Sequence, residues 1–269
     1  MSEVVQSSIE DGVAVLTLNR PERLNAWTAE MERSYFDLLA DCGQRDDVRA
    51  IVVTGAGRGF CAGADMDELR SIGDGNLEAA ARDRDTRPQA FPLSIPKPII
   101  AAINGPVAGI GLVQALMCDL RFAAEGAKIT TAFARRGLVA EHGISWILPR
   151  LIGPARALDL LLSGRIVLAG EAAELGLVNR VLPPESLRDE TLSYARELAA
   201  RSSPGSMAAM KRQVYADLER GLTDAVTEAN RLMVESFGAP DFVEGVASFV
   251  ERREPRFAPL GSAELQETR

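Results

Sequence analysis

The chain has 269 residues, of which 46% are hydrophobic, and its formal net charge at pH 7 is −8. This length fits one large domain or two small ones, with enough apolar residues for a packed core. The acidic balance argues against nucleic acid or an anionic membrane as the general partner. The three cysteines, Cys42, Cys61 and Cys118, lie far apart without metal-ligand spacing. We therefore expect small buried thiols in a reducing compartment, and no disulfides.

The N-terminal ten residues lack the basic and apolar regions of a secretory signal, and they carry acids that a transit peptide avoids. Elsewhere no continuous apolar run approaches the length needed to span a bilayer. We therefore expect a cytoplasmic protein that does not cross a membrane.

The first predicted elements are a strand at 13–19, after an Asp-Gly turn, and a helix that begins after Thr28 and reaches Cys42. Apolar residues repeat along this helix at three- and four-residue spacing: Met31, Tyr35, Leu38, Leu39 and Cys42. A buried strand is predicted at 48–54. Strand and helix then alternate to about residue 182, which favours an α/β unit with mostly parallel pairing.

Two predicted buried strands, at 48–54 and 98–103, each end in a turn of small residues. The first turn covers 57–66, and the second covers 104–111, directly before a helix-like apolar pattern that begins at Leu112. Unpaired backbone N–H groups at such turns suit a developing negative charge. One such turn is more often explained by backbone geometry alone. Two of them could offer N–H groups to the same ligand atom.

The remaining predicted elements are shorter until two consecutive prolines, Pro183 and Pro184, interrupt the pattern. They are strands at 119–124, 128–131 and 178–181 and helical segments at 155–163 and 170–176. Beyond the prolines, four helices are predicted at 185–201, 205–219, 222–237 and 240–253. Such short helices need a partner surface to be stable. The sequence thus predicts a core at 1–184 and a helical segment at 185–269.

Several motifs together resemble the enoyl-CoA hydratase/isomerase (crotonase) superfamily. They are GRGFCAGADMDEL at 57–69, AINGPVAGIGL at 102–112, MCDLR at 117–121, LPRLIG at 148–153 and AAELGLV at 172–178. The likeness extends from the first strand to about residue 185. It implies the ClpP/crotonase superhelix of repeated ββα units. It also implies that the C-terminal helices pack trimers, commonly paired into hexamers.

The resemblance also implies an oxyanion hole for a thioester enolate. Its donors would be the backbone N–H groups of Ala64 and Ile110. Typical hydratases of the family carry two glutamates that position and activate water, and the corresponding positions here hold Val113 and Phe133. Neither side chain can move a proton, so water addition by paired glutamates is not expected.

One acid, Glu141, occupies the position where the family's double-bond isomerases carry a single acidic residue. One carboxylate suffices for that reaction, because it can take a proton from C2 and return it at C4 of the dienolate. We therefore favour enoyl-CoA double-bond isomerisation with Glu141 as the acid/base. Its neighbour His142, the only histidine, could act as a base or orient Glu141, or could be structural. A solvated loop glutamate is the other interpretation of Glu141.

Three alternatives stay open. One is hydration of enoyl-CoA, as in fatty acid degradation, by Glu141 alone. A second is a related hydrolysis of the thioester or of a C–C bond that involves His142. The third is a non-catalytic CoA-binding or interaction protein that has kept the oxyanion hole and lost its acids, as Val113 and Phe133 permit. Binding of RNA is disfavoured by the acidic balance.

For coenzyme A, the resemblance places the adenine against Ala62, Asp65 and Met66 and the pantetheine near Arg23 and Leu24. The phosphates would meet a basic residue of the last helix, for which Arg252 is the match, with Phe249 nearby. Coenzyme A enters as part of the substrate. We expect no permanently bound cofactor and no metal.

Two other features have competing explanations. Asp65 and Asp67 could cap the start of a helix, and Arg135 and Arg136 are expected to be solvated or to contact another subunit. The charged segment 71–90 is either a solvated helix-loop or, by its position in the family, a flap over the acyl pocket.

Overall fold

The structure, a computed structural model, describes residues 3–73 and 85–260. The larger of its two sheets has six strands in the order β1-β2-β3-β4-β6-β9. Only β1 is antiparallel to its neighbour, and the other pairs are parallel. The strands are β1 (Val5–Glu10), β2 (Val13–Leu18), β3 (Ala50–Gly55), β4 (Ile99–Ile103), β6 (Leu120–Ala124) and β9 (Arg180–Leu182).

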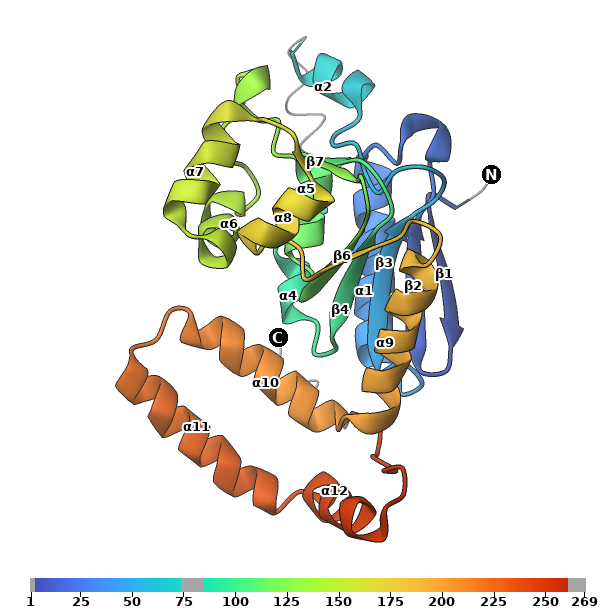
Figure 1. Cartoon of the computed structure of the whole chain (residues 1–269), viewed down its shortest axis with the longest axis vertical. Helices are drawn as coiled ribbons and strands as arrows, with labels where there is room; N and C mark the ends of the chain where they lie inside the picture. Colours follow the sequence, from blue (N-terminus) through green and yellow to red (C-terminus); the bar gives the residue numbers. More distant parts are fainter. Residues whose placement is uncertain (1–2, 74–84, 261–269) are drawn as a thin grey trace.

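The six-stranded sheet is covered by helices on both faces (Figure 1), α1 (Ala29–Gln44) on one and α9 (Leu187–Arg201) on the other. Alternate side chains of β3 enter different cores, as the period of a strand requires. Ile51 and Val53 belong to the main core with α1, whereas Ala50 and Val52 pack with α9. This two-sided burial explains why β3 and β4 are almost continuously apolar.

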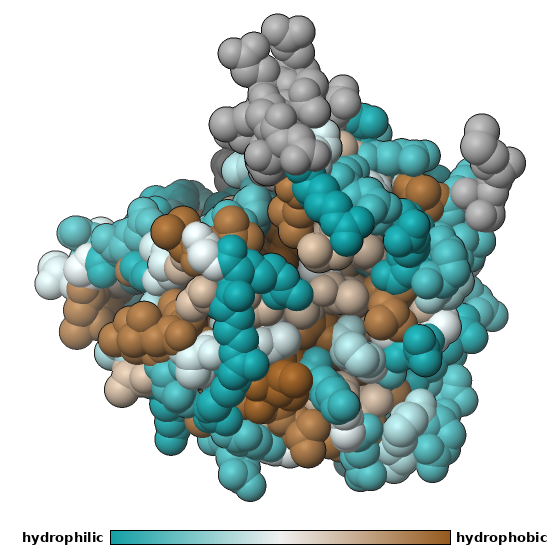
Figure 2. Space-filling model, turned by 90° about the horizontal axis from the view of Figure 1, so that it is seen from above, coloured by the Kyte–Doolittle hydropathy of each residue, from teal (hydrophilic) through white to brown (hydrophobic). Residues whose placement is uncertain are grey.

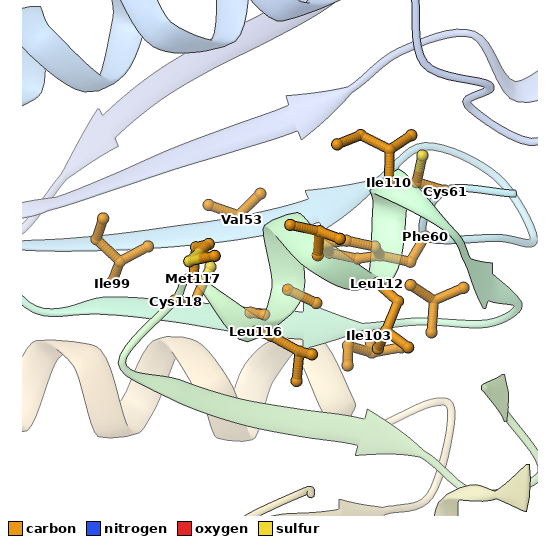
Figure 3. Close-up of a cluster of buried hydrophobic side chains, with 14 of the residues drawn as sticks. Val53, Phe60, Cys61, Ile99, Ile103, Ile110, Leu112, Leu116, Met117 and Cys118 are labelled. Carbon is orange, nitrogen blue, oxygen red and sulfur yellow. The ribbon is translucent and has the colours of Figure 1, made fainter. Parts of the chain in front are cut away.

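A second, smaller sheet has three strands. It consists of β5 (Val107–Ala108), β7 (Lys128–Thr130) and β8 (Val167–Leu168), with β7 parallel to β5 and antiparallel to β8. The helix α5 (Ile110–Leu116) follows β5 directly, and all of its residues are buried. Figure 3 shows α5 lying along β3 and β4, with Leu112, Leu116 and Met117 in the same buried cluster as Val53 and Ile99.

The remaining elements before α9 surround this core. They are η1 (Pro21–Arg23), α2 (Met66–Gly73), α4 (Phe91–Ser94), η2 (Ala134–Arg136), α6 (Ile144–Ile152), α7 (Pro154–Ser163) and α8 (Ala169–Leu175). The C-terminal helices α10 (Pro204–Asp217), α11 (Leu222–Phe237) and α12 (Pro240–Glu251) extend along one side of the molecule (Figure 1).

One polar cluster attaches α10 to the core. The ammonium group of Lys211 donates to Asp119 Oδ2 at 2.8 Å and to the carbonyl oxygens of Pro92 and Lys97. The Tyr215 hydroxyl donates to the other oxygen of Asp119 at 3.0 Å. Because Asp119 lies directly before β6, these contacts fix α10 to the central sheet.

The expected mixed α/β fold is confirmed, and the predicted helices after Pro184 are present. The predicted N-cap is confirmed too, since the Thr28 hydroxyl accepts from the Met31 N–H at 3.2 Å. The elements that were not predicted include the edge strand β1 and the helix α6. The division between residues 184 and 185 stays a prediction, although α9, beyond it, packs on the sheet.

All three cysteines are free and buried. Burial raises the pKa of the Cys61 and Cys118 thiols to about 12 and that of Cys42 to about 11. The thiols are therefore neutral small side chains of the core, as predicted. In the described part of the chain, no helix is both long and apolar enough to cross a membrane. Of the charged segment 71–90, residues 74–84 lie outside the described residues.

Candidate active site

A cavity of about 650 Å³ lies where the two small-residue turns meet. Its walls come from the turn after β3, the start of α5, the segment after β7 and the first residues of α1 and α2. This volume is within the range of small-molecule sites. Figure 2 looks onto the end of the molecule that carries α2, where apolar side chains are exposed near the middle of the face among hydrophilic ones.

The backbone N–H of Ala64 is directed away from its neighbouring chain segment. Ala64 forms a parallel bridge with Trp27, in which Trp27 donates to Gly63 O at 2.8 Å and accepts from the Asp65 N–H at 2.9 Å. In a parallel bridge, the residue between those two partners directs its own N–H to the other side. Among the described residues, no acceptor receives this N–H. Ala64 lines the cavity.

The second candidate donor, the N–H of Ile110, begins α5. The first N–H groups of a helix have no acceptor within it, and none of the described residues accepts from Ile110. The preceding Gly109 has φ +50° and ψ −125° and donates its own N–H to Thr130 O at 3.3 Å. Since side chains disfavour this backbone conformation, glycine is suited to turning the chain into α5 here. Ile110 also lines the cavity.

Close backbone packing brings the two turns together. Ala108 donates to Cys61 O at 3.0 Å, and Cys61 forms a parallel bridge with Val107. A Cβ atom at Gly111 would lie 2.6 Å from the carbonyl oxygen and side chain of Cys61. Figure 3 shows Cys61 next to the first turn of α5. The glycine therefore permits the contact that sets the spacing of the two candidate donors.

Residues of the turn before α1 contact the turn that carries Ala64 and hold it in place. The Asn25 side chain is fully buried and donates to Ala56 O and Gly59 O, at 3.0 and 2.8 Å. Arg20 forms an ion pair of 2.9 Å with Asp65. Burial favours a raised pKa for Asp65, but the N–H of Asp67 and the Arg20 guanidinium outweigh it and hold the pKa below its ordinary value. The contact of Asp65 Oδ1 with the Asp67 N–H, 2.9 Å, is that of a helix cap.

Glu141 and His142 line the same cavity as Ala64 and Ile110. Their side chains are 32% and 20% exposed, so the pair is partly shielded from water, and His142 Nε2 lies 3.5 Å from Glu141 Oε2. His142 adopts a left-handed backbone conformation with φ +58°, followed by Gly143 at φ +82°, directly before α6. These two residues with positive φ form the turn that precedes α6, and the side chains of Glu141 and His142 lie beside the cavity.

The two positions that hold glutamates in typical hydratases are apolar and buried. Val113 belongs to the core and has no exposed surface, while Phe133 is 5% exposed and forms part of the cavity wall. Paired glutamates are therefore absent from these two places. Within residues 3–73 and 85–260, no group of three or more histidine, cysteine or acidic side chains could hold a metal ion.

The residues expected to contact coenzyme A fall into two groups. Four of them line the cavity: Arg23, Ala62, Asp65 and Met66. Leu24 is beside it and accepts from the Ala62 N–H at 3.0 Å. Phe249 and Arg252 lie at the end of α12, among residues that do not line the cavity of this single chain. Their contacts with coenzyme A stay predictions.

The structure also adds a cavity residue that the sequence did not single out. Glu32 of α1 is only 4% exposed and lines the cavity. A sign of it is present in the sequence, since Glu32 stands four residues before Phe36 and seven before Leu39, on a buried face of the helix. An acid on such a face is unusual unless it has partners.

Comparison with known proteins places the chain in a family. A model of the enoyl-CoA hydratase/isomerase family matches residues 8–259. A curated relative from Escherichia coli, named 1,2-epoxyphenylacetyl-CoA isomerase, is 36% identical over 96% of this chain and 99% of its own length.

Two solved structures show the same fold. An enoyl-CoA hydratase from Mycobacterium marinum is 50% identical, with a TM-score of 0.70 over 81% of this chain and all of that one. An enoyl-CoA hydratase from a Polaromonas species is 30% identical, with a TM-score of 0.88 over 94% of this chain and 99% of that one. By its sequence and its fold, this chain belongs to the enoyl-CoA hydratase/isomerase family, of the crotonase superfamily, and is an enzyme of that family that acts on acyl-CoA.

Proposed function

We propose that this enzyme moves the double bond of an enoyl-CoA, with Glu141 as its only proton-transferring group and the N–H groups of Ala64 and Ile110 as the oxyanion hole. The carboxylate of Glu141 removes a proton from C2 of a β,γ-unsaturated thioester. The electrons of that C–H bond form a dienolate, whose negative thioester oxygen accepts hydrogen bonds from both N–H groups. The protonated Glu141 then returns the proton at C4, which leaves the α,β-unsaturated product and the original carboxylate.

One observation carries this proposal. Glu141 lines the same cavity as Ala64 and Ile110, whose N–H groups have no acceptor among the described residues. The positions of the hydratase glutamates hold Val113 in the core and Phe133 in the cavity wall. Backbone donors in a water-poor cavity stabilise an enolate without side chains, and each is worth about 3–4 kcal/mol in the transition state. The relatives' names include both isomerase and hydratase, so they do not separate the two reactions.

The test is proton exchange at C2, followed by NMR in deuterium oxide with a saturated or β,γ-unsaturated acyl-CoA. We expect Glu141→Gln to slow exchange by at least about a hundredfold, because the amide keeps the shape but cannot accept the proton. The matched control is Glu125→Gln, which changes an exposed glutamate outside the cavity and should leave the rate unchanged. Exchange that is equally fast in Glu141→Gln would remove this residue from the mechanism.

A second reaction has support from the pair formed by Glu141 and His142. With a separation of 3.5 Å, His142 could help Glu141 to activate water for addition or for hydrolysis of the thioester or a C–C bond. In that case one water molecule is consumed, either added to the double bond or divided between the two products of hydrolysis, and His142→Gln lowers product formation. Isomerisation by Glu141 alone needs no such help, so the same variant would change that rate little.

A non-catalytic CoA-binding protein is the alternative of a different class. It would bind acyl-CoA in calorimetry and give no C2 exchange with any acyl group. Binding itself rests on the cavity residues Arg23, Ala62, Asp65 and Met66 together with Leu24. Arg252 and Phe249 would join them only through a different arrangement of α12 or through another copy of the chain.

We also propose that the chain assembles as a trimer or as a hexamer of two trimers. The C-terminal helices support this assembly, because α11 has no buried residue in the single chain and α12 has only Ser248. Large apolar side chains on these helices are exposed, among them Leu222, Val234, Val243, Phe249 and Val250. An apolar surface of this kind is typical of an interface.

A further inference from the structure

Glu32 is a buried acid for which the proposed reaction has no use. It lies in the first turn of α1, is 4% exposed and lines the cavity. A buried carboxylate is costly unless its oxygens are satisfied or neutralised. Its role therefore depends on what surrounds it.

Three neutral donors meet the Glu32 carboxylate. Oε2 accepts from the Trp27 indole N–H at 3.1 Å and from the Gln89 amide at 2.6 Å, and Oε1 accepts from the Asp85 N–H at 3.3 Å. In the described part of the chain, no cation forms an ion pair with it, and the nearby Arg87 pairs with Asp85 and Asp37. A carboxylate offers about four acceptor positions. Among the residues that the structure describes, one position, on Oε1, therefore has no donor.

A relay of amides holds this carboxylate in place. Gln114 of α5, which is 1% exposed, donates to Gln89 Oε1 at 2.7 Å, and Gln89 in turn donates to Glu32. Because the side-chain oxygen Oε1 of Gln89 accepts from Gln114, the side-chain NH2 group of Gln89 is turned toward Glu32. The acceptor is held rigidly before any ligand arrives, as a specific binding group needs to be.

Glu32 is connected to the proposed oxyanion hole through a single residue, Trp27. Trp27, which donates to Glu32, is the residue whose backbone pairs with Ala64. Ala64 would bind the thioester oxygen, so a group that lies beside Trp27 is close to the acyl end of the substrate. We therefore assign the group that reaches Glu32 to the acyl chain.

The other residues that line the cavity restrict the charge that the substrate group near Glu32 can carry. An acyl carboxylate would be repelled by Glu32, and an ammonium group would share the cavity with Arg23 and Arg136. Apolar side chains, such as Phe133 and Leu138, make either charge costly to bury. A neutral donor has neither penalty, and a hydroxyl group is the simplest one.

We propose that Glu32 is a specificity-determining residue that accepts a hydrogen bond from a hydroxyl group on the acyl part of the substrate. This inference rests on the proposed acyl-CoA site and adds its substrate class, hydroxylated acyl-CoA thioesters. Sites that bind a hydroxyl group discriminate strongly against analogues without it, because a buried polar group is then left unpaired.

The experiment compares acyl-CoAs with and without the hydroxyl group, by calorimetry and by C2 exchange. The panel consists of hexanoyl-CoA with a hydroxyl at C4, C5 or C6, phenylacetyl-CoA with a hydroxyl at each ring position, and both unsubstituted thioesters. The native protein should bind at least one hydroxylated member at least about tenfold more tightly than its unsubstituted counterpart. Equal affinities across the whole panel would overturn the inference.

Variants separate recognition from a merely structural role. Glu32→Met has a similar volume without an acceptor, so it should lose the preference while binding the unsubstituted thioester about as well as the native protein does. Gln89→Met removes one donor that orients the carboxylate but keeps the acceptor itself, so the preference should fall less than in Glu32→Met. Glu32→Gln is the least disruptive change and should lower the preference for the hydroxylated thioester. This variant keeps the test possible if Glu32→Met fails to fold. Equal weakening of both ligands in Glu32→Gln would mean that Glu32 only stabilises the fold.

The two readouts also separate this inference from the proposed reaction. C2 exchange without any preference for a hydroxyl group would contradict the role of Glu32 and leave the reaction intact. A preference in binding, without exchange of any member, would contradict the reaction and support the role of Glu32.

Discussion

Asp65 links the turn that carries Ala64 to the rest of the molecule. Its side chain is 7% exposed and pairs with Arg20, and Arg20 also donates to Ala26 O at 2.6 Å, just before Trp27. Asp65 therefore holds the segment that carries Ala64 against the segment before α1.

Because the pKa of Asp65 is lowered in the folded state, its charged form stabilises the fold. The stabilisation is full above the unfolded pKa, about 3.9, and is lost as the pH falls through the lower folded pKa. We expect Asp65→Asn to lower the free energy of unfolding by about 1–3 kcal/mol at pH 7. Urea titrations between pH 7 and pH 2 should show this difference shrinking in acid.

The control for this prediction is Asp67→Asn. Asp67 is 62% exposed in its ion pairs with Arg23 and Arg70, and pairs of this kind contribute little. A difference between Asp65→Asn and the native protein that stays constant down to pH 2 would contradict the assigned cause.

At the scale of elements, the site depends on how closely α5 approaches the turn after β3. The Ile110 N–H is the first group of that helix, and Gly111 is in contact with Cys61. The side chains of β3 and β4 pack against α5 and so stabilise its position beside the turn after β3 (Figure 3).

We expect Gly111→Ala to separate the two turns. The added methyl group would lie 2.6 Å from Cys61 atoms, including a carbonyl oxygen, so the backbone has to move. The free energy of unfolding should fall by about 1–3 kcal/mol, and kcat should fall by at least about tenfold as the two proposed oxyanion donors move apart. Thermal unfolding and steady-state kinetics measure the two effects.

Gly170→Ala is the matched control, because Gly170 lies in α8 with no atom within 4 Å of the added methyl group and no positive φ. It should leave kcat unchanged and leave stability equal or higher by up to about 1 kcal/mol. Unchanged kcat in Gly111→Ala would show that the spacing of the turns does not set the rate.

The sequence predicts these elements well where burial is two-sided and poorly where tertiary contacts decide. The β-branched run at 51–54 reveals β3, because both faces of that strand are covered. The strand β1 buries only Val5, so its sequence carries no apolar pattern and its pairing comes from the hairpin with β2. The helix α6 contains Pro149, which hides it from a search for regular helices.

The candidate site was predicted unevenly for similar reasons. Ala64, Ile110 and Glu141 were assigned through motifs, and the structure places all three around one cavity. Glu32 was missed because no local pattern shows that Trp27, Asp85 and Gln89 converge on it. Contacts between distant segments of this kind depend on the completed fold.

At the scale of the whole molecule, the extended C-terminal helices are the least covered part of the single chain (Figure 1). Their arrangement separates α11 and α12 from the central sheet, although α10 is attached to it by Lys211. Helices of this kind are stabilised by packing on another surface.

We expect light scattering at micromolar concentration to give the mass of a trimer or hexamer. Phe249→Asp and Val243→Asp replace side chains that are 85% and 65% exposed in the single chain, so they should weaken assembly while changing monomer folding little. Glu251→Gln on the same helix is the control. A monomeric native protein would contradict the proposed assembly.

The central claim is that Glu141 moves a proton between two carbons of a thioester without adding water. The most direct measurement incubates the enzyme separately with 3-hexenoyl-CoA and 2-hexenoyl-CoA and identifies the products by mass and NMR. The same two hexenoyl-CoAs with a hydroxyl group at C5 or C6 serve if the unsubstituted chains bind weakly. We predict interconversion of the two double-bond isomers at unchanged mass, with its rate abolished by Glu141→Gln. A 3-hydroxyacyl-CoA formed as the main product, heavier by one water molecule, would contradict it.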